Sequence, residues 1–134
     1  MRKRLMAITL IGAAIASMIG LAVADAQPAA HAPQECFYSQ DWNGWKASPD
    51  SKSIYIRVGV NRIFRLDLSQ ACTELQMPDV HLVTKLRGSS SICSALDIDL
   101  RVSDGHGFET PCIVSNITRL SDAEAAALPK KQRP

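Results

Sequence analysis

The chain has 134 residues, 21% of them charged and 46% hydrophobic, and this length leaves room for one small domain rather than two. Of its 15 basic and 13 acidic side chains, the first 26 residues hold three basic and one acidic. The remaining chain is therefore close to neutral, which argues against a nucleic-acid-binding protein, because such a protein needs a basic surface.

The first 26 residues have the organisation of a removable export signal. A basic start at residues 2–4 precedes an apolar run over 5–23 and a small-residue cleavage site, Ala-Asp-Ala, at 24–26. We therefore predict a signal peptide over 1–26 and a periplasmic or secreted protein. The alternative is an uncleaved anchor, since about 19 apolar residues can span a bilayer. After cleavage we expect no stable membrane insertion, because no second apolar span follows.

Residues 27–35 are rich in Ala and Pro and predict a flexible leader before a folded domain over 36–120. Five segments of this domain alternate between apolar and polar residues, as β-strands do. These segments are 53–58, 62–68, 80–86, 96–102 and 112–120. The first two are close enough to form a hairpin around Gly59 and Asn61. The outward faces of the predicted strands are charged, which indicates an antiparallel sheet with one side in water.

The predicted fold class is mainly β, with a small antiparallel sheet of about five strands in a meander, a sandwich or a partly closed barrel. A short helix follows, because Ser121 and Glu124 form a capping box and Pro129 ends the helical segment. Residues 121–134 are thus predicted to be a short helix with a basic tail that is frayed and solvated.

Four cysteines lie in the part of the chain that would be exported, where disulfides form and persist. They are Cys36, Cys72, Cys93 and Cys112. Their wide spacing disfavours thioredoxin-like redox chemistry and a zinc site. Four cysteines permit three pairings. We favour Cys36–Cys112, which would tie the first ordered residues to the last strand, with Cys72–Cys93, which would close a loop of about 20 residues.

The segment Trp42-Asn43-Gly44-Trp45 is the most unusual motif in the domain. Asn-Gly predicts a two-residue hairpin turn, which would set the two tryptophans opposite each other. Because the chain has few aromatic residues, we favour a role for both indoles in capping a small core. The alternative is a flat surface that stacks on a sugar or a peptide.

Histidines provide the candidate metal ligands. His106 lies in a glycine-flanked turn over residues 103–107, and with Asp104 and His81 it offers the imidazole and carboxylate groups that metals bind. No recognised ligand spacing accompanies these residues, so the turn is read as an ordinary Asp-Gly turn. We retain His106 as a weak binding candidate and predict no metal and no cofactor.

Two carboxylates provide the candidate acid–base chemistry. Asp97 and Asp99 are predicted neighbours on one face of the segment 96–102, where like charges can raise one pKa and support glycoside-type hydrolysis. The same alternation is typical of any solvated strand face. Arg101 lies on that face and is the simpler partner for both carboxylates, so we assign no catalytic residue.

Several segments together resemble a known group of sequences. They are the start Cys36-Phe37-Tyr38, the strand Ser53-Ile54-Tyr55-Ile56-Arg57, the strand Phe64-Arg65-Leu66-Asp67-Leu68 that leads to Cys72, and the later segments Ile92-Cys93-Ser94-Ala95-Leu96-Asp97 and Cys112-Ile113-Val114. Over roughly 36–120 the chain resembles an uncharacterised family of small exported four-cysteine proteins of Gram-negative bacteria. That family is a domain of unknown function, so the resemblance implies an exported disulfide-linked domain and no activity.

These observations favour a non-enzymatic periplasmic binding or interaction module. Its partner would be an unknown envelope protein or a cell-wall ligand, bound at Trp42, Trp45 or His106. The alternative is a small metal-dependent or carboxylate-based hydrolase of the cell envelope. A structural or stress-related envelope component without a small ligand is the third hypothesis.

Overall fold

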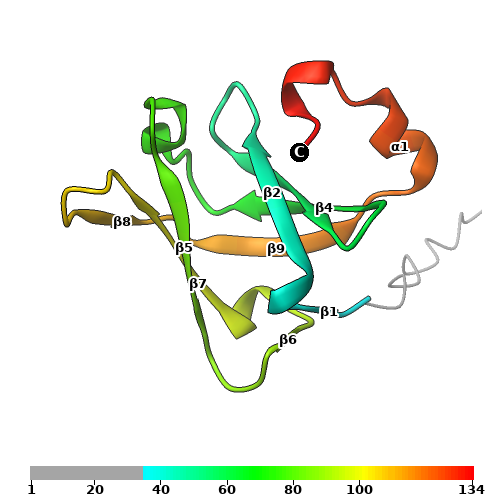
Figure 1. The fold of residues 1–134 in the computed structure, drawn as a ribbon, viewed down its shortest axis with the longest axis horizontal. Coiled ribbons are helices and arrows are strands. Elements are labelled where there is room, and N and C mark those ends of the chain that lie inside the picture. The colour runs from blue at the N-terminus through cyan, green and yellow to red at the C-terminus, as the bar shows by residue number, and fades with distance from the viewer. Residues whose placement is uncertain (1–34) are drawn as a thin grey trace, which may run out of the picture. The chain divides into compact units, whose positions relative to one another are not determined.

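The computed structural model describes residues 35–134, which form nine strands, four short 3₁₀ helices and one α-helix (Figure 1). The predicted signal peptide and all but the last residue of the predicted leader lie outside the described residues. Every strand pairing is antiparallel and no sheet closes on itself among residues 35–134, so the predicted mainly β class is confirmed. Within the same range no helix is long and apolar enough to cross a membrane.

The largest sheet has four strands in the order β2-β3-β4-β9. Their bounds are β2 (Trp42–Ala47), β3 (Ser53–Val58), β4 (Arg62–Leu68) and β9 (Val114–Arg119). The predicted hairpin is confirmed, since Val58 of β3 lies opposite Arg62 of β4 across a turn in which Gly59 has a φ of 63°. β2 and β9 are the edge strands of this sheet.

The second sheet has three strands in the order β5-β7-β8, and a two-stranded ribbon pairs β1 with β6. The bounds are β5 (His81–Leu86), β7 (Ile98–Ser103), β8 (Glu109–Pro111), β1 (Phe37–Tyr38) and β6 (Ser91–Ile92). The short 3₁₀ helices are η1 (Ser39–Asp41), η2 (Thr73–Gln76), η3 (Ala95–Asp97) and η4 (Lys130–Gln132). The strand predicted over 96–102 begins only at Ile98, and Leu96 lies in η3, where it is 76% exposed.

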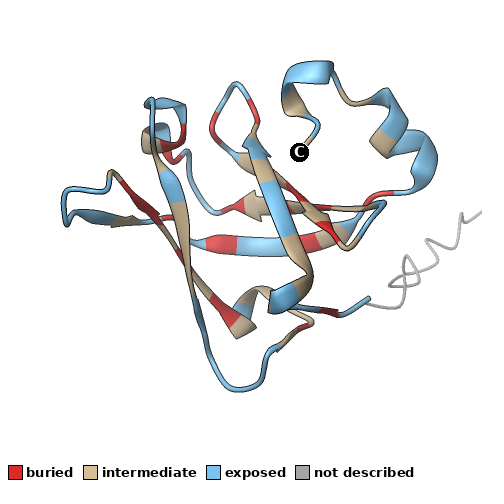
Figure 2. Ribbon diagram, in the orientation of Figure 1, coloured by how far each residue is buried: buried red, intermediate tan, exposed pale blue. Residues whose placement is uncertain are grey.

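One hydrophobic core lies between the two larger sheets (Figure 2). Alternate residues of β3, β4 and β7 point into it, as the strand pattern predicts, and the phenylalanine rings of Phe37 and Phe64 pack with centroids 4.7 Å apart. The inward residues of these strands are Ile54, Ile56, Val58, Phe64, Leu66, Leu68, Ile98, Leu100 and Val102. The ribbon adds Phe37 and Ile92, and β9 adds Val114 and Ile117. The two sheets are thus the walls of a single domain.

The C-terminal segment is ordered rather than frayed, while its basic residues Lys130, Lys131 and Arg133 are exposed to solvent as predicted. The predicted helix is present as α1 (Asp122–Ala127), with the Ser121 hydroxyl and the Glu124 carboxylate forming the predicted capping box. Beyond it, the Arg133 guanidinium donates hydrogen bonds to the carbonyls of Leu128 and Ala126, and η4 contacts β2. A cation at the carbonyl end of a helix is favourable, because it meets unpaired acceptors.

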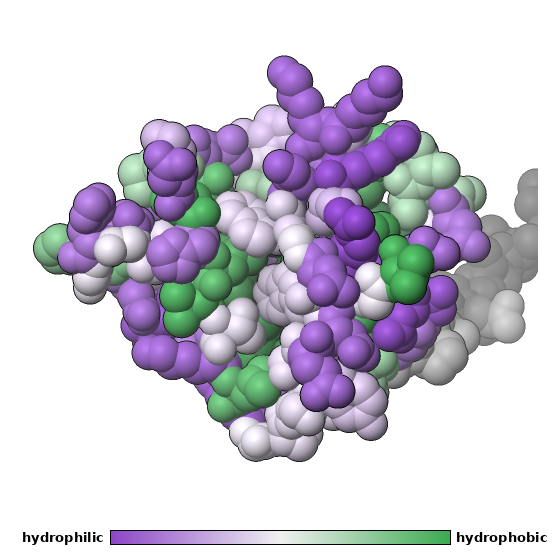
Figure 3. Space-filling view, in the orientation of Figure 1, coloured by the Kyte–Doolittle hydropathy of each residue, from purple (hydrophilic) through white to green (hydrophobic). Residues whose placement is uncertain are grey.

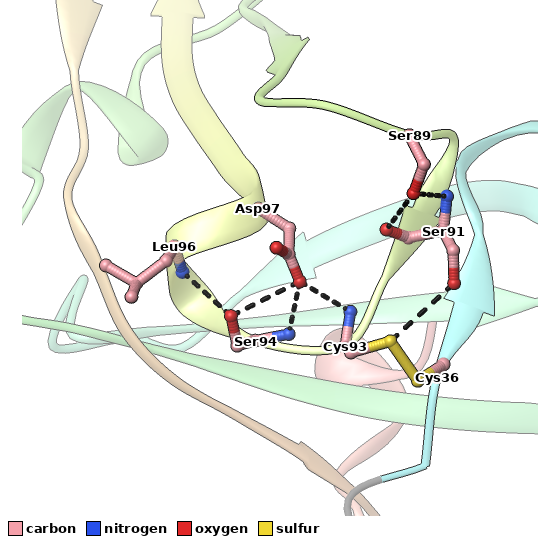
Figure 4. The surroundings of a disulfide bond; sticks show 7 residues. All are labelled: Cys36, Ser89, Ser91, Cys93, Ser94, Leu96 and Asp97. Atoms are coloured by element: carbon pink, nitrogen blue, oxygen red, sulfur yellow. Dashed lines mark hydrogen bonds between the residues drawn. A yellow bond between two sulfur atoms is a disulfide. The ribbon is translucent and has the colours of Figure 1, made fainter.

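The favoured disulfide pairing is wrong. Cys36 is bonded to Cys93, and Cys72 to Cys112. The first bridge extends the β1–β6 ribbon, in which Phe37 lies opposite Ile92, so the next residue on each strand is a cysteine (Figure 4). The physical reason for the correction is strand register, which places these cysteines opposite each other although they are far apart in the sequence.

The second bridge joins segments from the two larger sheets. Cys72 follows β4, and its N–H donates to the Ser51 carbonyl (2.9 Å), while the Cys112 N–H donates to the Leu100 carbonyl of β7 (2.9 Å). Both cysteines are buried. The bridge therefore fixes the segment before β9 to the edge of the core.

Removal of the second bridge should destabilise the fold strongly. A Cys72→Ala/Cys112→Ala variant loses a cross-link of sequence separation 40. The unfolding free energy should fall by about 4 kcal/mol, because the unfolded chain gains loop entropy. Guanidinium denaturation measures this loss, and non-reducing peptide mapping of the wild type should yield Cys36–Cys93 and Cys72–Cys112 peptides. Peptides that join Cys36 to Cys112 would contradict the fold described here.

Candidate functional site

A groove of about 380 Å³ lies between β2 and β5, the edge strands of the two larger sheets. We call it the Trp–Leu groove. Its lining residues are Trp42 and Trp45 of β2, Leu82, Thr84 and Leu86 of β5, and Ser39 of η1. The space-filling view shows apolar surface exposed along β5, beside the paler surface over β2 (Figure 3). Leucine and indole side chains share this lining with the hydroxyls of Ser39 and Thr84 and with other polar groups.

The two tryptophans share the groove because β2 contains a bulge at Asn43-Gly44, so the prediction of a hairpin turn there is wrong. Trp42 lies opposite Val58 and Trp45 opposite Ile56, so β2 uses one more residue than β3 between these pairs. In a regular strand, residues three apart point to opposite faces, whereas the extra residue of a bulge brings them to one face. The indoles therefore pack against the core, as predicted, and also line an open groove. Their stacking on a sugar or a peptide stays a prediction.

The bulge is built from the two residue types that suit it. Gly44 has a φ of 73°, in the left-handed region that glycine adopts without steric cost. The Asn43 side-chain amide donates to the carbonyls of Asp41 (3.0 Å) and Gly59 (3.3 Å), which ties the bulge to the turn between β3 and β4. The positions of both indoles thus depend on these two residues.

The backbone of β5 is unpaired on the side that faces the groove. Arg87 N–H donates to the carbonyl of Asp97, its opposite residue (2.8 Å), which identifies the hydrogen-bonded pairs of the β5–β7 ladder. Along an antiparallel ladder, hydrogen-bonded pairs alternate with non-hydrogen-bonded pairs, whose N–H and C=O groups point away from the partner strand. The N–H and C=O groups of Leu82, Thr84 and Leu86 therefore point away from β7. These are the same residues whose side chains line the groove.

The backbone of β2 is also unpaired along the edge that faces away from β3. Ser48 N–H donates to the carbonyl of Ser53, its opposite residue (2.8 Å), so these two residues form a hydrogen-bonded pair. Because bonded and non-bonded pairs alternate, the N–H and C=O groups of Trp45 and Ala47 point away from β3. Ser39, which precedes β2, donates its N–H to the carbonyl of Ser90, which follows β5 (2.9 Å). The start of β2 therefore lies beside the end of β5, and the two edges run in opposite directions (Figure 1).

A second cavity, which we call the lysine pocket, adjoins the groove at Trp45 and has a volume of about 410 Å³. It is lined by Trp45, Lys46, Ala47, Leu75, Gln76 and Lys131. Lys131 reaches this position because η4 packs against β2. Neither Lys46 nor Lys131 forms an ion pair with any residue in 35–134. The combined surface has leucine and indole side chains at one end and two lysines at the other.

The candidate carboxylate pair is divided between two structural roles (Figure 4). Asp97 accepts hydrogen bonds from the backbone N–H groups of Cys93 (2.9 Å) and Ser94 (2.7 Å), so it caps η3 beside the first disulfide. These bonds, the Cys93 N–H first, hold the pKa of Asp97 below its ordinary value. Asp99 lies on β7 and pairs with Arg101 (3.3 Å), as the strand pattern predicts. The two carboxylates therefore serve separate structural contacts and do not form an acid–base pair.

The histidine candidates lie outside both cavities. Asp104 accepts a hydrogen bond from the His106 N–H (2.8 Å), which makes the segment 103–107 the ordinary turn that the sequence predicts. The same bond is the main cause that lowers the pKa of Asp104. His81 lies at the start of β5, close to Gly105. Within residues 35–134 no cluster of three or more His, Cys, Asp or Glu side chains can hold a metal ion. The weak assignment of binding to His106 stays a prediction.

Sequence reasoning found the tryptophans of this site and missed the rest. Leu82, Thr84 and Leu86 were visible as alternate residues of a predicted strand, but their edge position depends on which strands pair. Lys46 and Lys131 are ordinary surface lysines by sequence, and only the packing of the C-terminal segment on β2 brings them together.

Comparison with known proteins gives a family without an activity. The model of DUF6491, a family of unknown function, matches the chain over residues 1–134, so the chain belongs to this family. No curated protein and no solved structure matches the chain. The prediction of a domain of unknown function is confirmed, and the match extends beyond the segment 36–120 on which the resemblance was based.

Gly44→Ala should weaken the fold and disturb the groove. A Cβ atom at this left-handed position costs about 1 kcal/mol of stability, although open space surrounds it. Gly44→Asn is the matched control, since asparagine tolerates this backbone conformation better. Urea denaturation and tryptophan emission measure the two effects. Equal stability of the alanine variant and the wild type would show that the bulge does not hold the backbone in this form.

Asp97→Asn should destabilise the protein at neutral pH and much less in acid. Because the folded-state pKa of Asp97 is lowered, its hydrogen bonds stabilise the fold above the unfolded-state value of about 3.9, and this stabilisation disappears as the pH falls through the folded-state value. Urea denaturation of both proteins at about pH 7 and about pH 2.5 checks this. A stability gap of the same size at both pH values would contradict the capping role.

Proposed function

We propose that this protein is a non-enzymatic binding module that holds a partner molecule in the Trp–Leu groove. The observation that carries the proposal is the combination of two half-buried indoles with the leucines of β5 in a cavity between two unpaired strand edges. Aromatic and aliphatic side chains with a few polar groups are the usual lining of a ligand site. A partner that covers them removes apolar surface from water, which favours binding by about 25 cal/mol per Å².

We further propose that the module acts in the periplasm or outside a Gram-negative cell. The basic, apolar and small-residue organisation of residues 1–26 supports export. All four cysteines are paired in two disulfides, and such bonds persist in oxidising compartments. The partner is then an envelope protein or a cell-wall component.

The hydrolase alternative gains no support from the geometry. The Asp97 carboxylate accepts three hydrogen bonds from the segment that it caps. The Asp99 carboxylate forms an ion pair with Arg101. His106 is exposed in its turn and lines neither cavity. A hydrolase needs its acid, base and substrate within hydrogen-bond reach of one another, and these residues are not gathered in that way.

Ligand binding should be lost when the groove is blocked. The exported protein, with both disulfides formed, is screened against extended peptides and cell-wall fragments by thermal shift and tryptophan emission. We expect one class to bind, and Thr84→Arg to weaken binding by at least about tenfold, because the longer side chain fills the groove. Val83→Arg is the matched control, since its side chain lies on the opposite face of β5.

Two results would oppose this proposal. One is that no peptide and no cell-wall fragment changes the melting temperature or the tryptophan emission. The other is that Val83→Arg weakens binding as much as Thr84→Arg, since the ligand would then lie on the solvent face of β5 rather than in the groove.

A further inference from the structure

We propose that the occupant of the Trp–Leu groove is an extended peptide segment that adds to the edge of β5 as an antiparallel strand and places a carboxylate in the lysine pocket. This inference rests on the proposed function and specifies the chemistry of the ligand. It is built on the unpaired backbone of β5, the alternation of its side chains and the charge at one end of the groove.

The backbone of β5 supplies the first argument. Leu82, Thr84 and Leu86 present three N–H and three C=O groups toward the groove, none of them used by β7. An added strand satisfies such groups, which is how extended peptides bind to open sheet edges. A glycan can stack on an indole, but it offers no regular alternation of donors and acceptors to this edge. The edge therefore favours a peptide over a sugar.

The side chains supply the second argument. In an added strand, successive side chains alternate between the two faces of the sheet, so every second residue of the ligand enters the groove. There it meets Trp42, Trp45 and the leucines of β5. The other residues of the ligand lie beside Val83 and Lys85 on the solvent face. The matching ligand has apolar residues at alternate positions over about five to seven residues, since β5 itself has six.

Charge supplies the third argument and sets the direction. Lys46 and Lys131 carry positive charge at the Trp45 end of the groove without an ion pair among residues 35–134. Because β2 and β5 run in opposite directions, this end lies beside the start of β5 (Figure 1). A strand antiparallel to β5 ends there, so its last residues bring an acidic side chain or a free C-terminal carboxylate to the two lysines.

The first test uses a library of nine-residue peptides in which apolar residues alternate with threonine and the last two residues are glutamate with a free carboxylate. Binding is measured by calorimetry with the disulfide-bonded protein. We expect members of this library to bind, and the best of them to lose at least about tenfold in affinity when its end is changed to glutamine amide. The Lys46→Gln/Lys131→Gln variant should bind both forms equally. Lys85→Gln, on the solvent face, is the control variant and should keep the preference for the acidic form.

The second test reads the backbone directly. Two versions of the best peptide are methylated on alternate backbone nitrogens. One version carries the methyl groups on its odd-numbered residues and the other on its even-numbered residues. One version should lose at least about tenfold in affinity, because it cannot donate to β5, while the other retains binding. In the complex with the unmodified peptide, the N–H groups of Leu82, Thr84 and Leu86 should exchange with solvent more slowly, whereas that of Val83 should not change.

The outcomes separate this inference from the proposed function. If cell-wall fragments bind and Thr84→Arg blocks them while no library peptide binds, the groove is a ligand site and the peptide proposal is wrong. If peptides bind but neither N-methylated version is weakened, strand addition is wrong. If the Lys46→Gln/Lys131→Gln variant keeps the preference for the acidic form, the placement of the carboxylate is wrong. If no probe binds, the proposed function itself fails.

Discussion

The constraint on which this structure depends is that two open sheets share one core and are joined through β7 and β9. The inward residues of β3, β4 and β9 pack with those of β7, and the Cys112 N–H bonds to the Leu100 carbonyl next to the buried Cys72–Cys112 bridge. Because the sheets are joined where β9 approaches β7, their opposite edges, β2 and β5, are left unpaired. The groove is thus a consequence of how the core is closed.

Unpaired edges are a hazard, because they pair with other chains unless something prevents it. β2 carries two features that oppose indiscriminate pairing: the bulge at Asn43-Gly44, which interrupts its ladder, and the charge of Lys46. β5 has a less protected edge, since Leu82, Thr84 and Leu86 form an uninterrupted alternation. The asymmetry suggests that β5 is the edge on which pairing is useful, and β2 supplies the aromatic wall opposite it.

Local sequence patterns were enough to predict strands and the helix cap. The disulfide pairing and the β5 side of the groove depend instead on how distant strands pair. The alternation of Ile54, Ile56 and Val58 and the capping pair Ser121 and Glu124 act over a few residues, so the sequence was enough to locate them. The disulfides depend on which strands pair: the register that sets Phe37 opposite Ile92 also sets Cys36 opposite Cys93, and no spacing rule contains that information. For the same reason the tryptophans were identified while their partners on β5 were not.

Asn-Gly shows why a strong local signal can still be misread. The dipeptide supplies a left-handed residue and a side-chain amide, and both a two-residue turn and a bulge need them. The chain already turns at Gly59 between β3 and β4, and the Asn43 amide donates to the Gly59 carbonyl. The dipeptide is therefore used to hold a strand against an existing turn rather than to make a new one. As a result Trp42 and Trp45 both face the groove from one edge strand, β2.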